Sequence, residues 1–138
     1  GYTNAPFVSV VAPFATGNLV SRPVELVLLA QALRKGQGAL LSDASIDEMT
    51  APTYLNDGTL HADTRKAGYT TSFGYGLELR KPDGQDQWIA TKGGAIAGFK
   101  SMFMYFRGSD TAVAAVGNGN EDLFELCKQV ADAHGAVP

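Results

Sequence analysis

A lysine followed by small residues marks the part of the chain whose residue types could do chemistry. Lys92 is followed at once by Gly93, Gly94 and Ala95, and the segments on both sides alternate like strands. Glycines let a ligand approach the backbone N–H groups, and the lysine ammonium adds a positive charge beside them. That combination can hold a carboxylate or stabilise a developing oxyanion. The alternative interpretation is an ordinary strand connection with a solvated lysine.

The composition is that of one ordinary domain. The chain has 138 residues, of which 45% are hydrophobic and 18% are charged, and this length is enough to bury a hydrophobic core. The net charge of −3 provides no basic patch, so we do not expect nucleic acid as a partner. The apolar stretches are much shorter than a membrane span, so no membrane-spanning segment is expected.

The single cysteine and the two histidines do not form a reactive site in the sequence. Cys127 is the only cysteine, and its apolar helical neighbours favour a small buried side chain over a nucleophile. His61 and His134 stand far apart and lack the spacing of metal ligands. We therefore expect no metal site and no cofactor.

The pattern of apolar and turn residues predicts an α+β fold. Ser21 is expected to cap a helix with Pro23 in its first turn, and Gly36 is placed to end that helix. About four consecutive strands with short connections favour an antiparallel meander covered by helices. The expected segments are an irregular lead-in at 1–20, two helices within 21–52, a long loop at 53–72, antiparallel strands within 73–118 and a closing helix at 120–135.

The closing helix should bury its inner side against the sheet. The helical spacing places Leu123, Cys127 and Val130 on that inner side. The strand residues expected to receive them are Phe103, Tyr105 and Val113.

Four segments, in order, resemble motifs of serine β-lactamase-like proteins, which include class C β-lactamases, penicillin-binding D-alanyl-D-alanine carboxypeptidases and related esterases. Gly17–Ser21 resembles the "G-G-L-V-S-T" motif that precedes a helix, and Leu40–Ser42 resembles "L-L-S-P". Tyr75–Leu79 resembles the "Y-G-L-G-W" strand. Lys92–Phe99 is similar to the "H-G-G-G-L-P-G-F" or "K-T-G" motif. The resemblance covers roughly residues 15 to 134 and implies the C-terminal part of such a protein.

The resemblance implies acyl transfer from an amide or ester through a serine nucleophile. It implies that Lys92 supplies positive charge and that Gly93 and Gly94 leave room for substrate. It also implies that the Ala95 N–H is one of two oxyanion donors. The periplasm or the outside of the cell is the location that the family favours.

The chain also departs from the family's motifs. None of its seven serines has a lysine three places on, so the S-x-x-K nucleophile motif is absent. Tyr2-Thr3-Asn4 matches Y-x-N in letters but lies too close to the helix of Gly17–Ser21, and a chance match is the better account. Gly93 replaces the hydroxyl residue of K-T-G, which removes a donor to a substrate carboxylate and favours ester or other amide substrates.

Two functions remain open from the sequence. The first is the C-terminal part of a serine hydrolase, inactive alone, whose partner is an N-terminal portion of the same protein that carries S-x-x-K and Y-x-N. The second is a non-catalytic binding or interaction module on the same scaffold. A fragment would also expose a sheet edge near Tyr75–Lys81, which either forms a homodimer contact or is covered by the segment 53–72.

Overall fold

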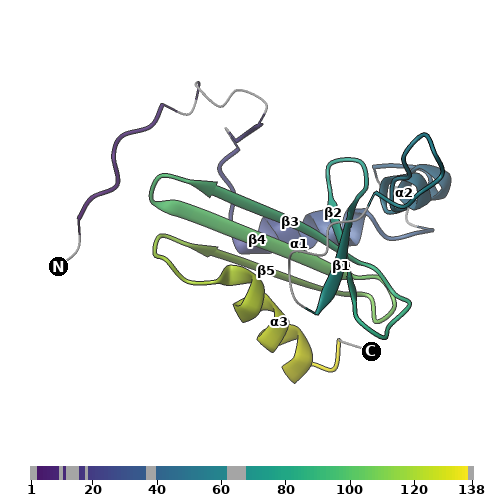
Figure 1. Ribbon diagram of the computed structural model, residues 1–138. Helices are drawn as coiled ribbons and strands as arrows, with labels where there is room; N and C mark the ends of the chain where they lie inside the picture. Colours follow the sequence, from purple (N-terminus) through teal and green to yellow (C-terminus); the bar gives the residue numbers. More distant parts are fainter. Residues whose placement is uncertain are drawn as a thin grey trace.

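The computed structural model describes residues 3–9, 11, 16–17, 19–36, 40–61 and 68–136. Within these residues the chain forms helices on both sides of one antiparallel sheet, the predicted α+β arrangement (Figure 1). The elements in chain order are α1 (Pro23–Ala32), α2 (Asp43–Met49), β1 (Tyr69–Phe73), β2 (Glu78–Pro82), β3 (Ile89–Ile96), β4 (Phe99–Phe106), β5 (Thr111–Gly117) and α3 (Leu123–Ala133). None of these helices is long and apolar enough to cross a membrane.

The sheet has five strands in the order β1-β2-β3-β4-β5, rather than about four. The additional strand is β1, which lies at the end of the segment 53–72 that the sequence predicts as a loop. Tyr69 pairs with Pro82 and Phe73 pairs with Glu78, so β1 covers the edge of β2. The edge expected near Tyr75–Lys81 is therefore covered by the predicted loop segment itself. The outermost strands of the sheet are β1 and β5 within the described residues.

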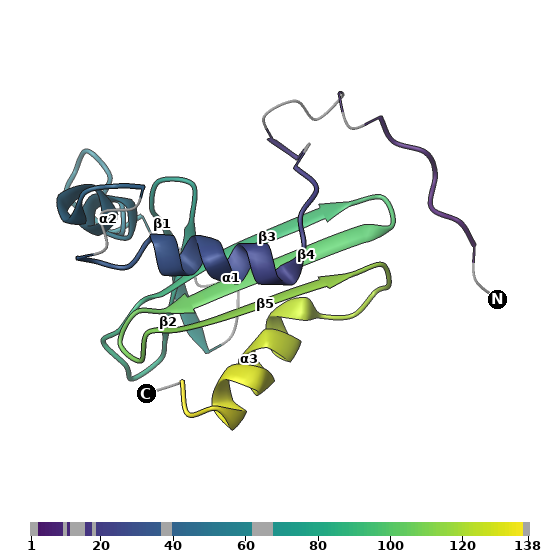
Figure 2. The same cartoon turned by 180° about the vertical axis from the view of Figure 1, so that it is seen from behind.

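Both faces of the sheet are covered by helices. One face carries Ile89, Met104 and Phe106, which pack with Phe124 and Cys127 of α3. Because side chains alternate along a strand, the neighbours of these strand residues point to the opposite face. Figure 2 shows α1 lying across that opposite face, and Figure 1 shows α3 running beside β5.

The face under α1 contains two residues that the sequence analysis assigned to α3. Phe103 and Tyr105 are buried with Ala30 of α1, so the prediction that they receive the closing helix is wrong. Val113 does pack on the α3 side. On α3 itself, Cys127 is buried as predicted, but Val130 is 40% exposed and lies outside the core.

Helix α1 begins one residue later than the sequence predicts. Its N-cap is Arg22 rather than Ser21, and Pro23 occupies the first turn. The Glu25 carboxylate accepts bonds from Arg22 N at 3.0 Å and from Ser21 Oγ at 2.8 Å. These bonds satisfy backbone and side-chain donors at the helix start. Gly36 lies beyond the end of the helix with φ of 75°.

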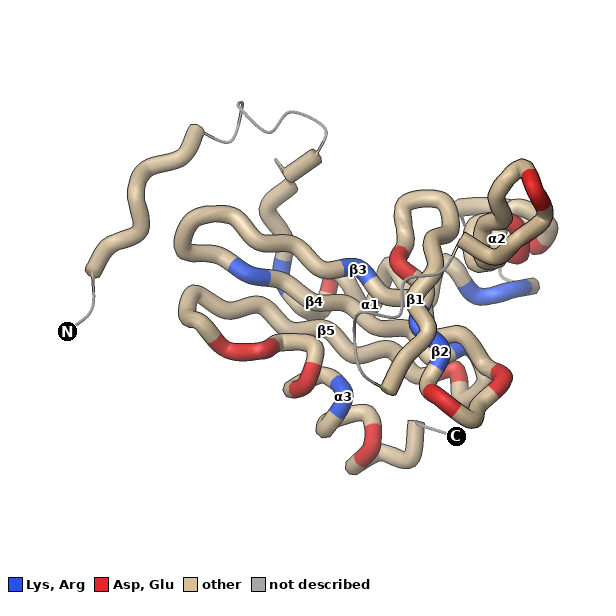
Figure 3. The backbone as a smooth tube through the Cα atoms, viewed as in Figure 1, with Lys and Arg blue, Asp and Glu red and all other residues tan. Residues whose placement is uncertain are grey.

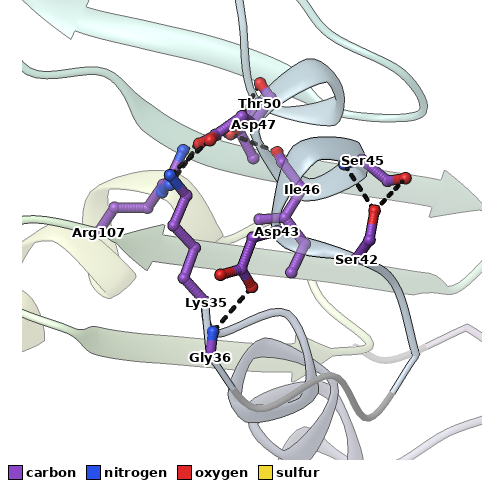
Figure 4. A network of polar contacts seen from close by, with 9 residues as sticks. All are labelled: Lys35, Gly36, Ser42, Asp43, Ser45, Ile46, Asp47, Thr50 and Arg107. Atoms are coloured by element: carbon purple, nitrogen blue, oxygen red, sulfur yellow. Dashed lines mark hydrogen bonds and ion pairs between the residues drawn. The ribbon is translucent and has the colours of Figure 1, made fainter.

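Helix α2 is held to the rest of the fold by a polar network (Figure 4). Asp47 Oδ2 lies 2.5 Å from Lys35 Nζ, and Asp47 Oδ1 lies 3.1 Å from an Arg107 nitrogen. Arg107 also donates to Thr50 Oγ1 at 2.5 Å. The turn between β1 and β2 packs closely on the end of α2, because a Cβ at Gly74 would meet the carbonyl oxygen of Met49.

Candidate functional site

The sequence analysis places the run from Lys92 to Ala95 between two strands, but in the structure Lys92 lies inside β3. It is paired in register with Phe103 of β4, and β3 continues to Ile96. The pairing between β2 and β3, however, ends at Thr91, which lies opposite Glu78. Lys92 is thus the first residue of β3 that is not paired with β2. Its side chain is exposed, and its ammonium has no ion-pair or hydrogen-bond partner among the described residues.

From Lys92 onward, one edge of β3 is uncovered within the described part of the chain. Residues 92–96 are all exposed, in contrast to the buried first three residues of the strand. In an antiparallel pair, alternate residues direct their N–H and C=O groups away from the paired strand. The two-residue turn at Ala97–Gly98 normally closes on a hydrogen-bonded pair, here Ile96 and Phe99. Counting back by alternation, Gly93 and Ala95 direct their backbone groups to the open edge.

A hollow of about 750 Å³ lies along this edge. Its walls come from the turn between β1 and β2, from β3 and β4, and from the start of α3. The residues that line it are Phe73, Gly74, Gly76, Leu77, Glu78, Lys92, Gly93, Gly94, Ala95, Lys100, Ser101, Met102, Asn120, Glu121, Asp122, Leu123 and Phe124. All four site residues predicted from the sequence therefore lie in one hollow.

The wall formed by α3 is fixed to the sheet by two contacts. Asp122 caps α3, and its carboxylate accepts a bond from Phe124 N at 3.0 Å. Lys100 of β4 donates through its ammonium to the Glu121 carbonyl oxygen at 3.2 Å. Lys100 is thus engaged in holding the hollow together, whereas the ammonium of Lys92 is available to a ligand.

Arg80, a second basic residue near the hollow, also has its charge bound by neighbouring side chains. Arg80 of β2 forms an ion pair with Glu78 and lies 4.1 Å from the centre of the Phe124 ring. Phe124 in turn contacts Tyr69 edge to face, with ring centres 5.5 Å apart. This cluster ties α3 to β1 and β2 and neutralises the Glu78 carboxylate.

Ser101 is one of the polar residues of the hollow that the sequence analysis did not assign to the site. Ser101 of β4 lines the hollow directly opposite Gly94. Its hydroxyl has no hydrogen-bond partner among the described residues. The signal in the sequence is the two-residue turn at Ala97–Gly98, because counting outward from it sets Ser101 beside Gly94.

The other predicted features lie apart from the hollow. Tyr2 of the Y-x-N match lies outside the described residues. Cys127 is fully buried, and burial raises the pKa of its thiol, so the thiol stays protonated at neutral pH. No cluster of His, Cys, Asp and Glu side chains suited to a metal ion occurs among the residues that were placed.

The beta-lactamase family model matches residues 2–135, nearly the whole chain. The comparison with curated proteins gives no match.

Proposed function

The chain belongs to the beta-lactamase family, and on that premise we propose that it forms one wall of a serine acyl-transfer site. It is the C-terminal part of a hydrolase that acts on a small amide or ester. The substrate lies in the hollow beside β3, and the catalytic serine comes from another portion of the protein.

The observation that carries this proposal is the free ammonium of Lys92 at an uncovered strand edge. Lys92 is exposed and is one of the residues that line the hollow, and no described residue pairs with its ammonium. An unpaired cation at a strand edge can stabilise the negative charge that develops when a carbonyl is attacked. A lysine held in an ion pair would be much less available for this task, as Lys128 is with Asp132 at 2.7 Å.

The backbone at Ala95 supplies the second part of the proposed site. By the alternation of the β3–β4 ladder, its N–H points to the open edge. A backbone N–H that is already aligned and unpaired stabilises an oxyanion without reorganisation when the reaction occurs. Gly93 and Gly94 carry no side chain that would keep a substrate carbonyl away from this edge.

The nucleophile in this proposal is a serine that this chain lacks. None of the seven serines has a lysine three residues later, so an S-x-x-K-bearing N-terminal portion of the same protein is the proposed partner. Its serine oxygen attacks the substrate carbonyl while the hydroxyl proton passes to a base on that portion. The tetrahedral intermediate then breaks its bond to the amine or alcohol, which leaves with that proton, and water hydrolyses the acyl-serine ester to release the acid and restore the serine. Lys92 and the Ala95 N–H stabilise the negative charge on the carbonyl oxygen.

A second candidate is a non-catalytic binding module on the same scaffold. The absence of S-x-x-K from the 138 residues favours it. The two candidates differ in what must lie upstream in the complete protein. A serine and lysine in S-x-x-K spacing, followed by Y-x-N, favour the hydrolase, and the absence of both favours the module.

The proposal is tested by acylation followed by mass spectrometry. The isolated chain and the complete protein are each mixed with an activated ester, and the acyl adduct is located by peptide mapping. We expect an adduct on a serine outside this chain and none on the seven serines within it. An adduct on one of those seven serines, or none in a complete protein that carries S-x-x-K, contradicts the proposal.

A further inference from the structure

We propose that Met102 is a modification site, at which a peroxide converts the thioether to a sulfoxide whose oxygen binds the backbone N–H groups at the open edge of β3. The sulfoxide then regulates the hollow by occupying that edge. An effect on acyl transfer follows only under the proposed function, whereas the oxidation and the closure of the strand edge depend on the geometry of the hollow alone.

Met102 of β4 lies over Gly93 of β3, on the side of the sheet that α3 covers. The two residues are paired in register, and Met102 packs against the core cluster that contains Met104 and Phe124. A Cβ at Gly93 would lie 3.2 Å from the Met102 Cε atom, so the end of the methionine side chain lies above the glycine. Both residues line the hollow. The thioether therefore reaches the part of the hollow that borders the open edge of β3.

The edge of β3 below Met102 carries N–H groups that a sulfoxide oxygen can bind. By the alternation of the β3–β4 ladder, Gly93 and Ala95 direct their N–H groups to that edge. Pairing with β2 ends at Thr91, so these N–H groups have no strand partner in the described part of the chain. Because Gly93 has no side chain, it leaves the space between the end of Met102 and the edge open.

Met102 is open to a small oxidant, whereas Met104 is not. Met102 is half-buried and lines the hollow. Met104 lies two residues further along the same strand and on the same face, but only 1% of it is exposed. The third methionine, Met49, is half-buried beside the cluster that contains Ala30 and is not among the residues that line the hollow. Because methionine must meet the oxidant to be oxidised, Met102 is the methionine of the hollow that a dissolved peroxide reaches.

The oxidation step needs only hydrogen peroxide. A lone pair of the Met102 sulfur attacks one peroxide oxygen, and the O–O bond breaks. The departing hydroxide takes the proton of the hydroxyl group that has joined the sulfur and becomes water. The sulfur has then lost two electrons and carries one oxygen, and the peroxide has been reduced to water.

The sulfoxide oxygen is expected to bind the edge of β3. It lies at the margin of an apolar core, where a polar group without a hydrogen-bond partner raises the free energy. The methionine side chain has three rotatable bonds, so the oxygen can turn from the core toward the N–H groups of Gly93 and Ala95. The Lys100 ammonium, which also lines the hollow, already donates to the Glu121 carbonyl oxygen. Once bound, the oxygen occupies the N–H that the proposed function assigns to the substrate carbonyl, and acyl transfer slows.

The experiment treats the chain with hydrogen peroxide and follows each methionine by peptide mass mapping and the backbone amides by NMR. Met102 should gain an oxygen atom at least about tenfold faster than Met104, which reacts only after local opening of the core. The amide signals of Gly93 and Ala95 should move downfield in step with oxidation of Met102, as expected for N–H groups that acquire an acceptor.

Two matched variants make the test specific. Met102→Leu keeps a side chain of similar volume but has no sulfur, so peroxide should no longer shift the amides of Gly93 and Ala95. Met49→Leu removes a sulfur on α2, away from the hollow, and should leave those shifts unchanged.

The effect on acyl transfer is measured in the complete protein. Peroxide should slow single-turnover acylation by an activated ester about a hundredfold, the lower end for loss of one oxyanion donor. Methionine sulfoxide reductases should restore the rate. The rate of Met102→Leu, compared before and after peroxide, should not change.

Three results would overturn the proposal. The first is oxidation of Met104 as fast as that of Met102. The second is amides of Gly93 and Ala95 that stay in place in the wild type or shift equally in Met102→Leu. The third is an unchanged acylation rate in fully oxidised protein. A complete protein that forms no acyl adduct even before peroxide contradicts only the hydrolase, because the oxidation rates and the amide shifts require no nucleophile and still decide whether the sulfoxide closes the edge.

Discussion

Lys35 Nζ lies 2.5 Å from Asp47 Oδ2, and this ion pair joins the segment after α1 to α2. Arg107, at the start of the turn between β4 and β5, binds the other carboxylate oxygen at 3.1 Å. Asp47 is thus the point at which three separate segments meet. Hydrogen bonds from Lys35 and then from Arg107 lower the pKa of the Asp47 carboxyl.

This lowered pKa predicts an acid-dependent loss of stability. The pKa of Asp47 is lower in the folded chain than in the unfolded chain, where it is about 3.9. The two ion pairs therefore stabilise the fold above that pH, and the stabilisation is lost as the pH falls through the lowered pKa. We expect Asp47→Asn to lower the melting temperature at pH 7 and to reduce the further fall of that temperature on acidification.

The control for this prediction is Asp86→Asn. Asp86 is exposed and forms no ion pair with any described residue, so its replacement should leave the pH profile unchanged. Parallel profiles for the wild type and Asp47→Asn between pH 7 and pH 2 would show that Asp47 does not contribute in this way.

The packing of α3 predicts a large difference between two of its residues. Leu123 is 7% exposed, whereas Val130 is 40% exposed. Leu123→Ala should lower the free energy of unfolding by ~2–5 kcal/mol, the usual range for a buried leucine. Val130→Ala should cost less than about 1 kcal/mol, because half-exposed sites lose little packing. Chemical denaturation measures both, and similar costs for the two variants would contradict the observed orientation of α3.

The open edge of β5 predicts self-association. Strand β5 carries no charged residue (Figure 3), and both α1 and α3 pack over it. A strand that is apolar on both faces but unpaired at its edge tends to add another strand, so we expect two copies to pair through β5.

A charged side chain on that edge should weaken the pairing. Val116 of β5 is 48% exposed, and Leu55 in the loop after α2 is 50% exposed. Sedimentation velocity over a range of concentrations should show less dimer for Val116→Lys, and an unchanged amount for Leu55→Lys. Equal dimer fractions in the two variants, or a wild type that stays monomeric throughout, would exclude the β5 edge as the contact.

The sequence predicts the fold class and most of the elements because their signals are local. Pro23 in a first turn and Gly36 beyond the helix mark α1 by backbone chemistry alone. The sequence does not reveal strand β1, because three polar residues in a row, Thr70 to Ser72, interrupt the apolar–polar alternation typical of a half-buried strand. Its pairing with β2 establishes it as a strand.

The assignment of residues to faces could not be made from the sequence. Along β4 both Phe103 and Met104 are apolar, so alternation gives two apolar faces and does not say which one receives α3. Contact with the two helices decides the matter, and it places Phe103 under α1 and Met104 under α3. The same limit applies to Val130, whose helical spacing suits the core but whose side chain lies at its margin.

The candidate site could be predicted in part. The Lys92-Gly93-Gly94-Ala95 run was found by its residue types, and all four residues line one hollow. Ser101 was missed because its relevance depends on the register of β3 and β4, which sets it beside Gly94. The strand end predicted at Lys92 is the end of pairing with β2, and β3 itself continues because β4 supports it.

The central claim is that the Lys92 ammonium stabilises the transition state of acyl transfer. Its most direct test is single-turnover acylation of the complete protein by an activated ester, with thermal melts alongside. We expect Lys92→Ala to slow acylation by the equivalent of about 2–4 kcal/mol, comparable to loss of one oxyanion donor, without a change in melting temperature. Lys128→Ala, which removes a lysine paired with Asp132 on α3, should acylate at the wild-type rate. Equal acylation rates for the wild type and Lys92→Ala would contradict the account and leave Lys92 as an ordinary solvated charge.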